Sequence, residues 1–125
     1  MNKILLISTA VLLTACASLQ FDALEYDRYI TVQELATNAQ TNCSDTFTVQ
    51  GQVDDLKTAM DHQFSYAQYR ESKPQVAEAA KNLKEMIDAL HKRYHSDIPT
   101  VGYCEEKLKN ITLGAQTVAR TLGRM

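Results

Sequence analysis

Residues 104–122 read CEEKLKNITLGAQTVARTL and carry the most regular apolar pattern in the chain. The apolar residues recur at steps of four and three, as side chains on one face of an α-helix do. They are Cys104, Leu108, Ile111, Ala115, Val118 and Leu122. Gly114 costs up to about 1 kcal/mol in helix propensity relative to Ala, so we expect it to mark a close helix approach. The stretch predicts an amphipathic helix whose apolar face needs partners.

Three earlier segments repeat this helical spacing. The first carries Phe21, Leu24, Tyr29, Val32, Leu35, Ala36 and Ala39. The second carries Val49, Val53, Leu56, Met60, Phe64 and Ala67, and the third Val76, Ala80, Leu83, Met86 or Ile87, Leu90 and Tyr94. Ser44-Asp45-Thr46 is available to cap the second helix, and Pro74 suits the first turn of the third.

These four one-sided helices predict an all-α fold, a small antiparallel four-helix bundle. The connections near 40–45, 70–74 and 96–100 are short, which favours antiparallel neighbours. No strand-period alternation runs long enough to suggest a sheet.

The N-terminal residues have the three parts of an export signal. Met1-Asn2-Lys3 is positively charged, and Ile4 to Leu13 form an apolar stretch too short to span a bilayer. Leu13-Thr14-Ala15-Cys16 then reads as a lipobox, and the leader resembles that of bacterial lipoprotein precursors. The alternative is an ordinary secretory signal with a chance Cys at position 16.

The lipoprotein resemblance implies cleavage before Cys16 and acylation of that residue, with a diacylglycerol on its sulfur and usually a third acyl chain. Residues 1–15 are then a signal peptide, 16–22 a lipidated tether and 23–125 the helical domain. Residue 17 is Ala rather than Asp. In lipoproteins of Gram-negative bacteria this resembles the pattern sorted to the outer membrane, so we expect a lipid-anchored protein on its periplasmic face.

With Cys16 assigned to lipid, an even pair of cysteines remains in an oxidising compartment, and Cys43 and Cys104 predict a disulfide. In an up-down-up-down bundle the starts of the second and fourth helices lie at the same end. Both cysteines sit at those starts, so topology and bridge agree. The closed loop of about sixty residues contributes roughly 4 kcal/mol on the chain-entropy model.

Composition excludes several functional classes. The formal net charge of −2 argues against nucleic-acid binding, which needs a basic face. The sequence has no phosphate loop, zinc-protease motif, nucleophile elbow or calcium loop. We therefore expect no enzymatic activity, no cofactor and no small-molecule substrate. The adjacent carboxylates Asp54 and Asp55 are expected to be solvated surface.

Two histidines form the best metal candidate, although we expect no resident metal. His91 and His95 stand four residues apart, which places both imidazoles on one helical face, and Asp88 is one turn earlier. The alternative is a solvated helix end, where His and Lys are favoured by the helix dipole.

A cluster of aromatic and basic residues falls where the first two helices would meet. Tyr26, Tyr29, Tyr66, Tyr69 and Arg70 are the candidate partner-binding residues, because Tyr and Arg are enriched at protein interfaces. The alternative is that some of these rings complete the core.

Beyond the leader, the chain loosely resembles the helical pilotins of type II secretion. The features that match are the leader, the length, four amphipathic helices and the Cys43/Cys104 pair with Pro99 before the second Cys. The resemblance implies a membrane-anchored adaptor or chaperone that binds a protein partner in the envelope. The alternative function is a phage- or plasmid-type lipoprotein that excludes superinfection or inhibits a cell-wall hydrolase.

Overall fold

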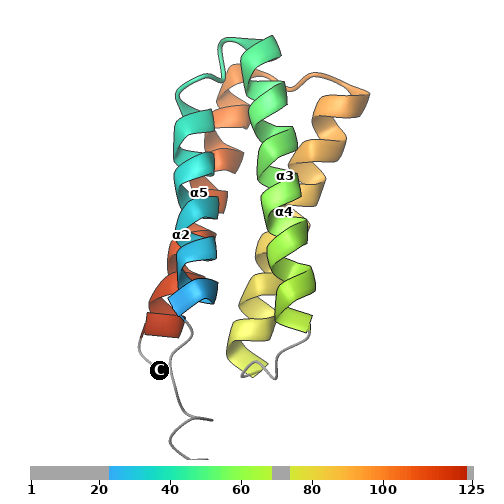
Figure 1. Cartoon of the computed structure of the whole chain (residues 1–125). Coiled ribbons are helices and arrows are strands. Elements are labelled where there is room, and N and C mark those ends of the chain that lie inside the picture. The colour runs from blue at the N-terminus through green and yellow to red at the C-terminus, as the bar shows by residue number, and fades with distance from the viewer. Residues whose placement is uncertain (1–22, 69–73, 124–125) are drawn as a thin grey trace, which may run out of the picture.

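The structure, a computed structural model, describes residues 23–68 and 74–123 of the 125-residue chain. These residues form four helices, α2 (Ala23–Gln40), α3 (Thr46–Gln68), α4 (Pro74–Ser96) and α5 (Val101–Gly123), and contain no strand. Each helix runs antiparallel to the next, and α5 returns to lie beside α2 (Figure 1). The predicted antiparallel four-helix bundle is confirmed. The leader, Cys16 and the proposed tether lie outside the described residues.

The core is built from one stripe on each helix, and every stripe keeps the same 4-3 spacing. On α2 and α3 the buried residues are Glu25, Tyr29, Val32, Ala36 and Ala39, then Val49, Val53, Leu56, Met60 and Gln63. On α4 and α5 they include Val76, Ala80, Leu83, Ile87, Leu90 and Tyr94, then Cys104, Leu108, Ile111, Ala115, Val118 and Leu122. The mean step of 3.5 residues is that of helices packed at small crossing angles.

The stripe predicted from the sequence is correct for all of α5 but wrong at two helix ends. Leu24 is 51% exposed and Glu25 is buried instead. Near the end of α3, Gln63 is buried, whereas Phe64 is only partly covered. In both places the packing register continues the 4-3 spacing, even where the next position in it is polar. Helix register therefore takes precedence over the hydrophobicity of single residues here.

Side chains cap the helix starts at the disulfide end. Asp45 accepts hydrogen bonds from the backbone N–H and the hydroxyl of Thr48, at 3.2 and 2.8 Å, and these bonds lower the pKa of its carboxyl. Thr100 Oγ1 accepts a hydrogen bond from the backbone N–H of Tyr103 at the start of α5. Both satisfy N–H groups that a helix start leaves without intrahelical acceptors.

The predicted disulfide is present, joining Cys43 after α2 to Cys104 in the first turn of α5 with a Cα–Cα distance of 5.8 Å. The end of α2 and the start of α5 lie at the same end of the bundle, opposite to the start of α2 (Figure 1), and the bridge ties this end. If residue 16 is lipidated, the bridge lies at the end away from the anchor.

The seam between α2 and α5 is the most extensive helix contact in the bundle. Its helices contribute small buried side chains, Ala36 and Ala39 from α2 and Ala115 and Ala119 from α5. The hydroxyls of Thr37 and Thr112 lie 3.5 Å apart across it. Small side chains allow two helices to approach closely, because interaxial distance follows side-chain size.

Charged side chains form ion pairs across the seam between α3 and α4. Lys57 of α3 contacts Asp61 at 2.9 Å and Asp88 of α4 at 3.1 Å. Lys84 of α4 contacts Asp88 at 2.5 Å and Asp61 at 3.4 Å. The four side chains are between 26 and 43% exposed, so each pair is screened by water and the network contributes modestly.

Candidate functional site

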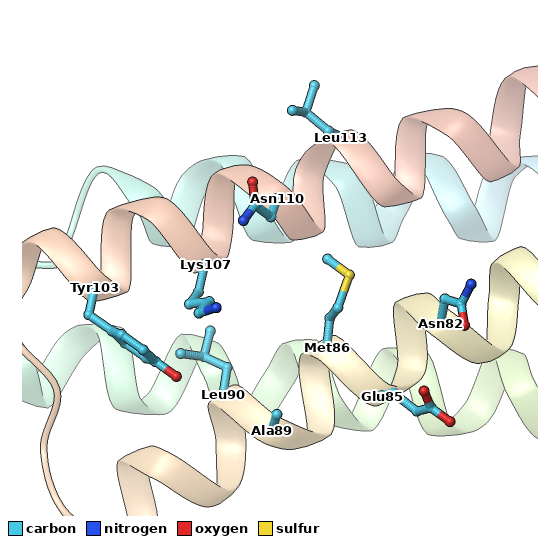
Figure 2. A pocket seen from close by; sticks show the side chains of 9 residues that line it. All are labelled: Asn82, Glu85, Met86, Ala89, Leu90, Tyr103, Lys107, Asn110 and Leu113. Atoms are coloured by element: carbon cyan, nitrogen blue, oxygen red, sulfur yellow. The ribbon is translucent and has the colours of Figure 1, made fainter.

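A groove of about 660 Å³ lies between α4 and α5. Figure 2 shows side chains of both helices along it. The lining residues are Asn82, Glu85, Met86, Ala89 and Leu90 from α4 and Tyr103, Lys107, Asn110 and Leu113 from α5. The volume falls within the range of small-molecule pockets, but the groove runs along two helices, a shape that also suits an elongated segment.

Helix packing explains why the groove has an apolar surface. Leu90 belongs to the core and is 1% exposed, so it forms part of the groove's base. Met86 is partly covered and points toward α5 (Figure 2), whereas Leu113 is 50% exposed. A Cβ on Gly114 would lie 3.3 Å from Leu83 Cδ1 and 3.8 Å from Met86 Cε. The missing side chain therefore lets residues of α4 lie against the backbone of α5, as we expected of this glycine.

The two ends of the groove differ in charge. Around Tyr103, the ammonium of Lys107 lies 5.3 Å and the guanidinium of Arg93 5.6 Å from the ring centroid, both within cation–π range. Arg93 also lies 3.7 Å from Asp97. Glu85 is nearer the other end of the groove, beside Asn82 (Figure 2). An acidic group is therefore favoured near Tyr103, and a basic group near Glu85.

Three large apolar side chains are exposed at the disulfide end of the bundle. Phe47 is 90% exposed in the first turn of α3, and Ile98 and Val101 are 57 and 45% exposed where α4 connects to α5. Val101 precedes the groove residue Tyr103 by two positions. Exposed apolar surface of this kind is found where proteins contact partners.

The tyrosines selected from the sequence do not form one surface. Tyr29 has 0% exposure, and its burial raises the pKa of its hydroxyl to about 12, so this ring is a core residue and we correct its assignment to the docking patch. Tyr26 and Tyr66 are partly exposed, and the Arg28 guanidinium lies 4.6 Å from the centroid of the Tyr66 ring. Tyr69 and Arg70 lie outside the described residues.

A smaller hollow of about 220 Å³ adjoins that arginine on the opposite side of the bundle, between α2 and α3. It is lined by Arg28, Thr31, Ala59, His62 and Gln63. It offers much less apolar surface than the α4/α5 groove, and we regard it as the weaker binding candidate.

The two candidate histidines meet the carboxylate of Asp54, which the sequence analysis assigned to solvated surface without linking it to the histidines. Asp54 Oδ1 lies 3.0 Å from His91 Nε2 and 2.8 Å from His95 Nε2. The hydrogen bond with His95 is the largest of the influences that lower the pKa of Asp54. The expected neighbour Asp88 is not part of this cluster, because its carboxylate oxygens are bound by Lys57 and Lys84.

Sequence reasoning missed the groove and the place of Asp54. Tyr103 and Leu113 are aromatic or apolar but lie outside the 4-3 stripe of α5. Met86, which the sequence offered as an alternative in the stripe of α4, leaves that position to buried Ile87. The sequence signal for the groove was the presence of such residues, outside the buried stripes, on two consecutive helices. For Asp54, the signal was a carboxylate in the first half of α3, which an antiparallel hairpin brings beside the second half of α4.

The chain shows no significant match to a protein-family model, a curated protein or a solved structure. Among the helices of residues 23–68 and 74–123, none is both long and apolar enough to cross a bilayer.

Proposed function

We propose that this protein is a non-enzymatic adaptor, anchored to the outer membrane through acylated Cys16, that holds a helical segment of an envelope protein between α4 and α5. The observation that carries the proposal is the α4/α5 groove, which presents Met86 and Leu113 to solvent over the buried base at Leu90. An amphipathic helix docks into such a groove through apolar residues spaced at three and four positions.

The length of the groove sets the size of the segment. Tyr103 and Leu113 are ten residues apart on α5, which corresponds to about 15 Å along a helix axis. About three turns of a partner helix fit along this length. Two or three apolar side chains of that helix would cover Met86 and Leu113.

Charge sets the direction in which the segment lies. Lys107 and Arg93 flank Tyr103 at one end, so an acidic residue of the partner is favoured there. Glu85, nearer the other end, favours a basic residue. The proposed ligand is therefore an amphipathic helix with opposite charges at its two ends.

The anchor brings the domain to its partner. Six residues, 17–22, separate the proposed lipid site Cys16 from the start of α2 at Ala23, a chain distance of at most about 25 Å. Acylation by two or more chains gives stable membrane attachment. The adaptor would thus work on segments presented close to the membrane surface.

Site-specific photocrosslinking in intact cells tests this proposal. A photoreactive residue replaces Leu113 in the groove, and in a matched control it replaces exposed Glu34 on α2. We expect position 113 to give a discrete adduct with one envelope protein, whose crosslinked peptide has apolar residues at helical spacing and a carboxylate. We expect position 34 to give no such adduct, and Met86→Asp to reduce the adduct at 113.

Three results would count against the adaptor. Equal adducts at both positions would show that the groove has no special role. The absence of any adduct at 113 would remove the support for a partner helix. An adduct with an incoming cell-wall hydrolase would replace the adaptor by the inhibitor function. Labelling with radioactive palmitate, compared between the wild-type protein and Cys16→Ser, tests the anchor separately.

A further inference from the structure

Asp54 of α3 and His91 and His95 of α4 bring three metal-ligating groups together away from the groove. Their ligand atoms all lie within 4.8 Å of one another. The two imidazole rings are neighbours, with centroids 4.4 Å apart, and both Nε2 atoms approach the same oxygen, Asp54 Oδ1. The cluster joins two helices rather than lying within one.

From this arrangement we infer that Asp54, His91 and His95 form a binding site for a divalent transition-metal ion of the zinc type. Zinc binds histidine nitrogen and carboxylate oxygen at about 2.0–2.2 Å in tetrahedral geometry, which places neighbouring ligand atoms about 3.3 Å apart. The present nitrogen–oxygen separations of 3.0 and 2.8 Å would widen by a few tenths of an ångström, and the two imidazole nitrogens, which lie within 4.8 Å of each other, would adjust to a similar separation.

The donor set selects the class of metal. Two imidazoles favour zinc, copper or nickel over magnesium and calcium, which prefer oxygen ligands. The spacing of four residues between His91 and His95 presents both rings on one face of α4, and Asp54 approaches from the neighbouring helix. Three protein ligands leave a fourth position to water, the arrangement of an open zinc site.

The site is accessible and its ligands do not need to break a core contact. The side chains of Asp54 and His95 are each 47% exposed and that of His91 is 26% exposed. An ion from solvent replaces the two contacts that Asp54 makes with the imidazoles. The neighbouring carboxylate of Asp88 is held by Lys57 and Lys84, so we do not include it among the ligands.

Calorimetric titration of the tag-free full chain with zinc chloride, after removal of metals by a chelator, tests the inference. We expect one ion per chain, and a melting temperature that rises with zinc and returns with EDTA. His91→Gln, His95→Gln and Asp54→Asn should each weaken zinc binding at least about tenfold, because even outer-shell changes at metal sites cost that much. His62→Gln is the matched control, since His62 is an exposed histidine elsewhere on α3.

Several outcomes would overturn the site. They are the absence of binding heat, equal weakening by His62→Gln, or zinc affinity that none of the three ligand variants changes. Circular dichroism of each variant establishes that it is folded, which we expect because all three side chains are at the surface. The visible spectrum of the cobalt-loaded protein gives a second measurement, and an octahedral rather than tetrahedral spectrum would contradict the proposed geometry.

Discussion

The two seams that α5 makes, with α2 and with α4, differ in how completely they close. Toward α2, the helix contact is the most extensive in the bundle, Thr37 and Thr112 meet across it, and the Cys43–Cys104 bridge fastens one end. Toward α4, larger side chains such as Met86 and Tyr103 border a groove of about 660 Å³. One helix therefore builds a closed seam on one edge and, on the other, a seam that stays open along part of its length.

We propose that this difference separates stability from binding in the molecule. The closed seam holds the first helix to the last and so completes the bundle. In the open seam the apolar side chain of Leu113 is exposed to solvent, which is unfavourable. A segment that covers it would remove this apolar surface from water. Changes at the closed seam should therefore alter folding, and changes at the open seam should alter binding.

The largest effect is expected from removing the bridge at the closed seam. Cys43→Ala together with Cys104→Ala releases a loop whose ends are 61 residues apart, and the chain-entropy model gives a loss of about 4 kcal/mol in unfolding free energy. Urea denaturation of the two proteins measures it. A loss below about 1 kcal/mol would show that the bridge adds little to the seam.

A pair of substitutions on α5 compares the seams directly. Ala115→Leu adds volume to the closed core and should cost roughly 1–3 kcal/mol, because overpacking displaces neighbouring side chains. Leu113→Ala, two residues away in the open seam, should change stability by less than about 0.5 kcal/mol. Thermal unfolding of both variants provides the measurement. Equal losses would contradict the division into closed and open seams.

Alkaline unfolding tests whether the interior on the α2 side excludes water. Burial raises the pKa of Tyr29 to about 12 from an unfolded value near 10, so above pH 10 the unfolded chain loses this proton first. Its contribution to stability is therefore intact below pH 10 and falls by on the order of 2 kcal/mol by pH 12. Tyr29→Phe should lack this part of the decline. Parallel curves for the two proteins would indicate that Tyr29 is hydrated.

A small effect is expected at the charged seam between α3 and α4. Partial burial acts to raise the pKa of Asp88, but hydrogen bonds from Lys84 and Lys57 outweigh it and hold the pKa below its ordinary value. The folded pKa is thus below the unfolded one, so the contribution is present above about pH 4 and is lost as pH falls further.

For such exposed pairs we expect Asp88→Asn to cost less than about 1 kcal/mol at pH 7. Melting temperatures of wild-type protein and variant, measured from pH 7 to pH 2, should converge below pH 4. The exposed Asp55→Asn is the control and should show no difference. A gap that stays constant down to pH 2 would assign the effect to packing rather than to charge.

The closed features of the fold could be predicted from the sequence because they depend on local spacing. The 4-3 steps from Cys104 to Leu122 define one helical face, and short connections leave little choice but antiparallel neighbours. Once the topology is antiparallel, Cys43 and Cys104 reach the same end of the bundle. Glu25 and Gln63 were missed because hydrophobicity alone does not show where a packing register continues through polar residues.

The open features depend on how two helices are placed relative to each other, which periodicity does not report. The groove arises where Tyr103, Lys107 and Met86 leave space between α4 and α5. Asp54 meets the two histidines because of the register between α3 and α4. That register gives Asp54 to His91 and His95 and leaves Asp88 to the lysines, although Asp88 is nearer in sequence. The sequence shows which residue types are present, but the structure was needed to show which side chains contact one another.

Chemical-shift mapping by NMR tests most directly whether the open seam is the binding site. The partner segment identified by photocrosslinking is titrated into the isotopically labelled protein, and amide shifts are followed along all four helices. We expect shifts concentrated around Met86, Tyr103 and Leu113, and at least about tenfold weaker binding in Leu113→Asp at an unchanged melting temperature. Shifts centred on α2 and α3, or equal affinity in Leu113→Asp, would contradict it.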